Sequence, residues 1–117
     1  MTNDLHVVLS IRLFTDQKCF GPGVAELLHR VEEHGSLRAA AKSLEMAYSK
    51  AWTLVHRAEE CLGFGLLQFT SGGKNGGGAK LTEQGRQMLS AYESYCDAVR
   101  AYAQKLFAET FPTNENS

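Results

Sequence analysis

Hydrogen-bonding and positively charged side chains follow one another in the middle of the chain, at spacings that place them on one side of a helix. Ser49, Thr53 and His56 are three or four residues apart and so share a helical face. Lys50 and Arg57 flank that face. Hydroxyl, imidazole and cationic groups together can bond base edges and phosphates. The pattern is typical of a helix that reads the major groove of DNA.

Two short helices and a tight turn, within residues 35–63, must position these side chains. Ser36 is a suitable N-cap for the first helix, and Gly63 is placed to end the second. Residues 45–47 form the predicted turn, with Met46 as its apolar plug. The second helix has an inward apolar face of Ala51, Val55, Ala58 and Leu62, with Leu54 beside it. This is a helix-turn-helix pattern.

A glycine-rich segment follows the two helices. Residues 64–70 and 79–81 predict two strands, and residues 71–78 form the loop between them. After a helix-turn-helix, such a hairpin is a wing. Its glycines allow the backbone to lie against phosphate, and Lys74 and Lys80 add charge. The loop lacks the GK[ST] sequence of a nucleotide-binding loop. The alternative is a hairpin tip without a function.

The N-terminal part predicts a strand and a helix. Apolar residues alternate with others over 5–14, which indicates a strand with one buried face. Residues 15–20 are predicted to be a polar connection. Pro22 suits the first turn of a helix over 22–34, and Gly35 ends that helix.

The last predicted element is a long helix that begins after an N-cap at Thr82 and ends near Phe107 or Glu109. Gly85 allows it to pass close to another backbone. Its heptad-like seam comprises Met88, Tyr92, Tyr95, Val99, Tyr102 and Leu106. The seam forms either a dimer interface or a contact with helix 22–34. The dimer is favoured, because so long a helix cannot bury its whole stripe on one small domain.

Composition bounds the class of protein. The chain has 117 residues, 44% of them hydrophobic, enough for one domain with a core. We expect no membrane span and no signal peptide, and hence a cytoplasmic protein. The net charge is −1, but cations outnumber acids within the helix-turn-helix, where Glu45 is the one acid between Ser36 and Arg57.

Cysteines and histidines give no sign of a metal site. Cys19, Cys61 and Cys96 are widely spaced and are expected to be reduced thiols, with Cys61 and Cys96 packed as small apolar groups. No Cys/His cluster has zinc-like spacing. No nucleophile, base and orienting group can be assembled from the sequence. We therefore expect neither a metal, nor a cofactor, nor an enzyme.

Four stretches together carry a family resemblance: residues 20–23, residues 35–42, residues 48–52, and residues 71–82 with Gly85. Over roughly residues 5–102 the chain resembles the N-terminal DNA-binding domain of the molybdate-responsive ModE-type regulators. It is more distantly similar to the N-terminal domain of LysR-type regulators, through Ala40-Ala41 and residues 59–63. The resemblance implies DNA binding and dimerisation. Because the chain ends soon after the long helix, we expect no molybdate site and leave any small-molecule effector open.

Contacts with DNA are expected from the helix-turn-helix and the wing. The resemblance implies contacts with DNA by Tyr48, Ser49, Lys50, Thr53 and Arg57. The helical wheel adds His56 to this set. The first helix of the motif normally crosses the DNA backbone, which adds Ser36 and Arg38. The wing contributes Lys74, Asn75 and Lys80. Tyr48 either bonds a phosphate or staples the turn. Trp52 is expected to brace the wing or the first helix rather than to stack on a base.

The predicted fold is mainly α with a small β-sheet, a winged helix-turn-helix with a long C-terminal dimerisation helix. Residues 1–83 would form the DNA-binding domain, 84–110 the dimerisation helix and 111–117 a disordered tail. The predicted function is sequence-specific regulation of transcription by a homodimer on double-stranded DNA. The alternatives are a protein-interaction module that kept the fold but lost DNA binding, and binding of a small ligand in a dimer cleft.

Overall fold

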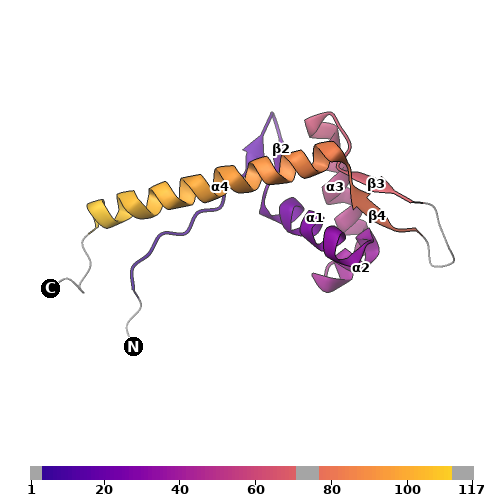
Figure 1. Ribbon diagram of the computed structural model, residues 1–117, viewed down its shortest axis with the longest axis horizontal. Helices are drawn as coiled ribbons and strands as arrows, with labels where there is room; N and C mark the ends of the chain where they lie inside the picture. The colour runs from indigo at the N-terminus through magenta and orange to yellow at the C-terminus, as the bar shows by residue number, and fades with distance from the viewer. Residues whose placement is uncertain (1–3, 71–76, 112–117) are drawn as a thin grey trace.

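The computed structural model describes residues 4–70 and 77–111 (Figure 1). The elements follow one another as β1 (Leu13–Phe14), β2 (Lys18–Phe20), α1 (Pro22–His34), α2 (Leu37–Ser43), α3 (Tyr48–Leu62), β3 (Leu67–Phe69), β4 (Ala79–Leu81) and α4 (Glu83–Thr110). The strands form two antiparallel pairs, β1–β2 and β3–β4. The predicted class, mainly α with a long last helix, is confirmed. Among the described residues, none of the helices combines the length and apolar character that crossing a bilayer requires.

Local sequence signals set the ends of the helices. Ser36 Oγ accepts a backbone N–H at 3.0 Å at the start of α2, and Thr82 Oγ1 accepts one at 2.8 Å at the start of α4. Gly35 and Gly63 follow α1 and α3 with φ of 81° and 87°, in the left-handed region where a side chain is strained. These four residues have the roles that the sequence predicted.

The turn between α2 and α3 is also where the sequence placed it. Glu45 adopts a φ of 56°, the one positive value among the described residues other than glycine. Met46 donates its N–H to the carbonyl oxygen of Ala41 at 2.9 Å, and its side chain packs against the core. The turn is therefore closed by a hydrogen bond and by an apolar contact.

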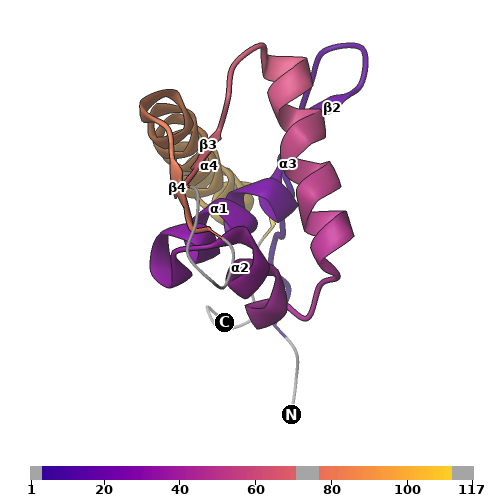
Figure 2. The same ribbon diagram turned by 90° about the vertical axis from the view of Figure 1, so that its right-hand side faces the viewer.

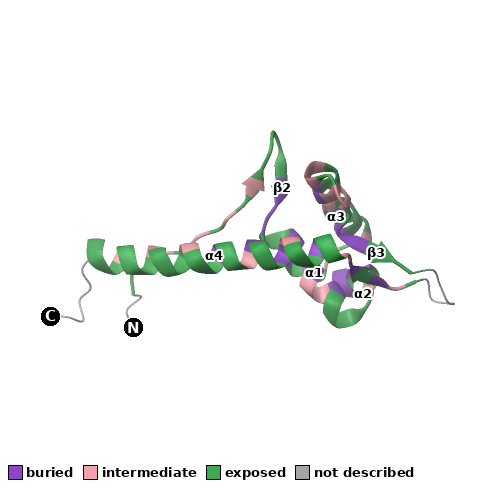
Figure 3. Cartoon of the chain, turned by 45° about the horizontal axis from the view of Figure 1, so that its top comes forward, coloured by how far each residue is buried: buried purple, intermediate pink, exposed green. Residues whose placement is uncertain are grey.

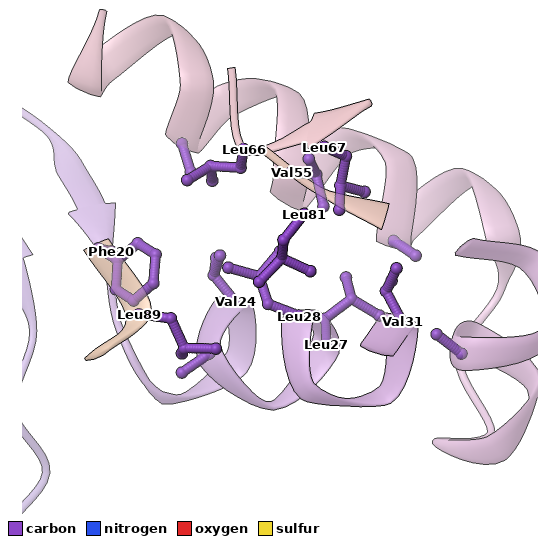
Figure 4. Packing of buried hydrophobic residues seen from close by; sticks show 14 of the residues in the cluster. Phe20, Val24, Leu27, Leu28, Val31, Val55, Leu66, Leu67, Leu81 and Leu89 are labelled. Atoms are coloured by element: carbon purple, nitrogen blue, oxygen red, sulfur yellow. The ribbon is translucent and has the colours of Figure 1, made fainter. Parts of the chain in front are cut away.

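Helix α1 lies at the centre of the core. Leu27, Leu28 and Val31 are fully buried, and Figure 4 shows them grouped with Leu81 of the hairpin. Helices α2 and α3 and strand β4 all contact α1. The inward faces of α2 and α3 contribute small residues, which permits the helices to approach closely: Ala40, Ala41, Ala51 and Ala58 are all buried.

The N-terminal segment differs from its prediction. A strand was predicted for residues 5–14, but only Leu13–Phe14 forms one, and it pairs with Lys18–Phe20. The prediction of a polar connection is wrong for residues 18–20, because Cys19 and Phe20 are buried. Phe20 packs edge-on against Tyr92 of α4, with ring centroids 5.0 Å apart. This buried contact turns the end of the connection into a strand.

The alternating pattern of the N-terminal segment has another cause. Val7, Leu9 and Ile11 are half-buried, while the residues between them are exposed. The segment runs along α4 (Figure 1), and residues 7–9 share a hollow with Arg100, Ala103 and Gln104 of that helix. The hydroxyl of Tyr92 donates to the carbonyl oxygen of Ile11 at 2.7 Å. Alternation thus reflects packing of an extended segment on a helix.

Cys19 of β2 and Cys61 near the end of α3 form a disulfide. The expectation of three reduced thiols is therefore wrong for this pair. The two cysteines meet because the β1–β2 hairpin lies beside the C-terminal end of α3 (Figure 2). Cys96 remains a buried free thiol, as predicted.

Helix α4 packs on the core through its first half alone, and within the described part of the chain its second half contacts only the extended N-terminal segment. Its buried residues are Gly85, Leu89, Tyr92 and Cys96, and the following turns project away from the body (Figure 3). The molecule is accordingly elongated, with extents of 64 × 34 × 22 Å. Gly85 lies against the backbone of Leu66, whose carbonyl oxygen would clash with an added Cβ. The predicted close approach at Gly85 is confirmed.

A partly exposed ionic hydrogen bond joins α1 to α4 and predicts a pH effect. His29 Nε2 bonds Glu93 Oε2, and this bond raises the pKa of His29 above its usual 6.5, while desolvation opposes the shift. Nearby Glu32 and Glu26 also raise it. A raised histidine pKa stabilises the fold fully below pH 6.5, and this contribution disappears as pH rises through the folded-state value. Because both side chains are half exposed, the contribution stays below about 1 kcal/mol.

We therefore expect the free energy of unfolding of the wild type to fall relative to that of Glu93→Gln between pH 6 and pH 8. Urea unfolding at both values measures it. His6→Gln, which changes an exposed histidine, is the control and should follow the wild type. An identical pH dependence in Glu93→Gln and wild type would contradict the assignment.

Candidate nucleic-acid interface

The outward face of α3 presents most of the side chains that the sequence selected. Ser49, Lys50, Thr53 and Arg57 are exposed, and His56 is half-buried. The Nδ1–H of His56 donates to the carbonyl oxygen of Trp52 at 2.9 Å, which directs Nε2 away from the helix backbone. The N-terminal half of α3 therefore offers hydroxyl, ammonium and imidazole groups to a partner.

Trp52 lies on this same face, which the sequence analysis did not expect. Its side chain is 45% exposed and stacks on the His56 ring, with centroids 3.6 Å apart and planes 16° apart. Its stacking partner is a residue of α3 itself, whereas the sequence predicted a contact with the wing or the first helix. On the helical wheel Trp52 lies at the border of the two faces, and the narrow inward stripe of Ala51, Val55 and Ala58 leaves it outside. With Tyr48, Ser49 and Thr53 it lines a shallow hollow of about 340 Å³.

A second hollow, of about 470 Å³, lies between α2 and the β3–β4 hairpin. It brings together Ser36, Arg38 and Tyr48 from the predicted set. The guanidinium of Arg38 lies 4.3 Å from the centre of the Tyr48 ring, so Tyr48 holds a cation at the rim of this hollow. The hollow is also lined by residues that the sequence analysis did not select, namely Lys42, Phe69, Thr70, Gly77 and Gly78. Lys42 could have been selected from the sequence, because it directly follows the run of alanines in the first helix of the motif.

The base of the hairpin is fixed to the helix-turn-helix by backbone contacts. The N–H of Ala79 donates to the carbonyl oxygen of Gly35 at 2.8 Å, and the N–H of Gly78 donates to Thr70 Oγ1 at 2.9 Å. A Cβ at Gly78 would lie 2.8 Å from the Gly35 oxygen, so glycine is required for this approach. The hairpin is therefore held beside the start of α2.

The end of α3 is fixed to the hairpin by one carboxylate. Glu59 Oε2 accepts the N–H groups of Leu66 at 2.7 Å and Leu67 at 3.2 Å. The negative charge of Glu59 is thereby used inside the protein, and its other oxygen is 4.0 Å from His56 Nε2. Glu59 therefore forms no ion pair with the α3 cations Lys50 and Arg57.

Four cations of α2 and α3 form none of the ion pairs found within residues 4–70 and 77–111, namely Arg38, Lys42, Lys50 and Arg57. The same holds for Lys80 on β4 and for Arg12 and Lys18 near the N-terminus. Elsewhere on the surface, Arg30, Arg86, Arg100 and Lys105 pair with acids of their own helices. Those same ranges also contain no cluster of three or more side chains suited to a metal ion. The chemistry available here is thus that of a surface that binds an anion.

The wing residues are described in part. Lys80 is exposed on β4 and faces Gln68 in the register of the hairpin. Lys74 and Asn75 lie outside the described residues.

The predicted seam on α4 divides into two parts. Tyr92 is buried in the core, and Met88 and Val99 are half-buried. Tyr95, Tyr102 and Leu106 are exposed, with Tyr102 65% accessible. Tyr92 therefore serves the fold of its own chain, whereas the later positions leave an apolar stripe uncovered in a single chain.

Three helices, a β-hairpin fixed beside the second of them, and a cation-bearing third helix define a winged helix-turn-helix of the DNA-binding type. Residues 24–86, more than half of the chain, match the family of bacterial regulatory helix-turn-helix proteins called the lysR family. The chain belongs to this family. Its helices and hairpin are accordingly those of a bacterial regulatory helix-turn-helix protein.

Curated relatives agree with this assignment. The transcriptional regulator ModE of Haemophilus influenzae is 33% identical over 89 residues, which are 76% of this chain and 33% of that protein. The DNA-binding transcriptional dual regulator ModE of Escherichia coli K12 is 31% identical over 88 residues, 74% of this chain and 33% of that protein. The molybdenum-pterin-binding protein MopB of Rhodobacter capsulatus is 34% identical over 82 residues, 70% of this chain and 29% of that protein. The chain spans about a third of the length of these relatives.

Proposed function

We propose that this chain recognises a two-fold DNA site as a homodimer and thereby regulates transcription. The observation that carries the proposal is the set of cations on α2 and α3 that form no ion pair with any described residue, together with the exposed hydroxyl groups of α3. In this arrangement α3 enters the major groove, and the start of α2 and the hairpin contact the neighbouring backbone. The half-sites would be about one helical turn of DNA, or a multiple of it, apart.

Selection from random duplexes tests this proposal. The purified protein is mixed with a pool of random duplexes at two salt concentrations, and the bound DNA is sequenced. We expect enrichment of a palindromic motif and a steep loss of affinity with salt, because phosphate contacts release counterions. Binding without a motif would contradict sequence-specific recognition. No binding at either salt would instead favour a protein-interaction module.

Removing a cation from α3 should weaken binding. For Lys50→Ala and Arg57→Ala we expect affinity for the selected duplex to fall about tenfold, the range of one charged contact to DNA. A side chain that binds phosphate should also lower the slope of log affinity against log salt by about one. Fluorescence anisotropy measures both quantities. Lys105→Ala, which removes a cation paired with Glu109 on α4, should bind like the wild type. Unchanged affinity in both α3 variants would show that another face binds DNA.

The exposed stripe on α4 supports the dimer. A second copy of α4 would cover Tyr95, Tyr102 and Leu106, which a single chain leaves exposed. We expect the double substitution of Tyr102→Asp and Leu106→Asp to convert a dimer to a monomer, because two charges would be buried at the centre of the interface. Sedimentation velocity measures the molecular mass. Ser94→Asp, on an exposed position outside the stripe, should remain dimeric. A monomeric wild type at all concentrations would exclude this interface.

A further inference from the structure

We propose that Trp52 determines specificity by contacting the 5-methyl group of a thymine in the major groove. The inference rests on the proposed function, since it requires α3 to lie in that groove. It goes further by naming the group of the base that is contacted and the side chain that contacts it. The starting observation is a large apolar ring, 45% exposed, among the polar groups of the recognition face.

The position of Trp52 on α3 is that of a base-reading side chain. It follows Tyr48 by one turn and shares the outward face of α3 with His56 and Ser49. Lys50 and Arg57, seven residues apart, lie together at one border of that face, and the guanidinium of Arg38 lies over the Tyr48 ring at the other border. Cations at both borders can approach the phosphates on the two sides of a groove, so a side chain on the face between them lies toward the base edges.

The indole is held in one orientation. The ring of His56 stacks on one of its faces, and His56 is itself fixed by the bond from Nδ1–H to the carbonyl oxygen of Trp52. Only the other face and the ring edge remain available to a partner. A side chain fixed before binding loses little conformational entropy in the complex, which favours a selective contact.

The hollow beside the indole matches a methyl group on a polar base edge. Its apolar walls come from Trp52 and Tyr48, and Ser49 and Thr53 supply hydroxyl groups at its border. Thymine is the one natural base that presents an apolar group in the major groove, with the O4 acceptor next to the methyl. An apolar wall beside a hydroxyl donor is complementary to this pair of groups.

Substitution of thymine by deoxyuridine tests the inference. Deoxyuridine retains base pairing and O4 but lacks the methyl group. Using the duplex selected above, each thymine of one half-site is replaced singly, and affinity is measured by anisotropy. We expect one or two positions at which the loss of the methyl lowers the affinity of the wild type about three- to fourfold, as for one buried methyl group.

The same duplexes are then measured with two variants. In Trp52→Ala, affinity for the thymine duplex should fall three- to tenfold, and the difference between thymine and uracil should vanish at the sensitive positions. Phe14→Ala removes an exposed aromatic ring (62%) outside the candidate interface and should retain the difference. Trp52→Phe, which keeps an aromatic surface, should retain part of it. Thermal unfolding of each variant verifies that the fold is intact.

The outcomes separate the inference from the function on which it rests. Equal affinity of the wild type for every uracil-substituted duplex would overturn the role of the methyl group while leaving DNA recognition in place. A thymine preference that persists unchanged in Trp52→Ala would assign the methyl contact to another residue and would also overturn the proposal. If no duplex binds in the initial selection, the proposed function and the inference both fail.

Discussion

Reduction of the Cys19–Cys61 disulfide is expected to lower the free energy of unfolding by about 3 kcal/mol. The bond joins residues 42 apart in the sequence, and closing a loop of this length removes much conformational freedom from the unfolded chain. It also holds the β1–β2 hairpin against the end of α3, where Thr15 Oγ1 lies 3.1 Å from Cys61 Sγ. Urea unfolding with and without a phosphine reductant measures the effect.

Two cysteine variants make the disulfide prediction specific. Cys61→Ser should have the lower free energy of unfolding expected of the reduced wild type, and adding reductant should not change it. Cys96→Ala changes the buried free thiol and should keep the full response. A wild type whose disulfide is verified by mass spectrometry, yet whose stability is the same after reduction, would contradict the prediction.

Replacement of Gly85 by alanine should also destabilise the fold, by about 2 kcal/mol. The added Cβ would overlap the carbonyl oxygen of Leu66 and lie 3.1 Å from both Leu66 C and Thr82 Oγ1. The obstacle is mainly backbone, so α4 must shift relative to the hairpin, at a cost of about 3 kcal/mol. The better helix propensity of alanine returns about 1 kcal/mol. In a domain of this size the net change lowers the melting temperature by about 10 °C.

Gly23→Ala is the matched control for Gly85→Ala. Gly23 is also within a helix, is exposed, and has nothing within 4 Å of an added Cβ. The substitution should therefore raise stability by about 0.5–1 kcal/mol through helix propensity alone. Differential scanning calorimetry compares the three proteins. Similar melting temperatures for the two variants would show that the contact at Gly85 is not restrictive.

Features set by neighbouring residues could be predicted from the sequence. The caps at Ser36 and Thr82 and the ends of helices at Gly35 and Gly63 depend on a few adjacent positions, and all four occur as predicted. The N-terminal strand could not be predicted in the same way. Alternation over residues 5–14 indicates that one side is buried, but not whether the neighbour is a strand or, as here, a helix.

Features that depend on distant partners were missed in the site as well. The pairing of Cys19 with Cys61 requires knowing that the β1–β2 hairpin reaches the end of α3. Trp52 lies outward because alanines fill the inward side of α3, and its stacking on His56 depends on side-chain orientation. The exposed positions of α3 could be predicted, because the helical period alone decides which residues share a face.

The projecting half of α4 has a consequence for the local dynamics of the chain. Beyond Cys96 this helix has no buried residue, so in a single chain its last turns are held mainly by their own backbone hydrogen bonds and by the extended N-terminal segment beside them. Helical turns with so little tertiary packing open readily, and their amide protons exchange with solvent much faster than those of the core. If a second copy covers the stripe, each α4 supplies the apolar contacts that the last turns of the other lack. The rate of amide exchange in these turns then depends on protein concentration, although the rest of the domain is a self-contained fold.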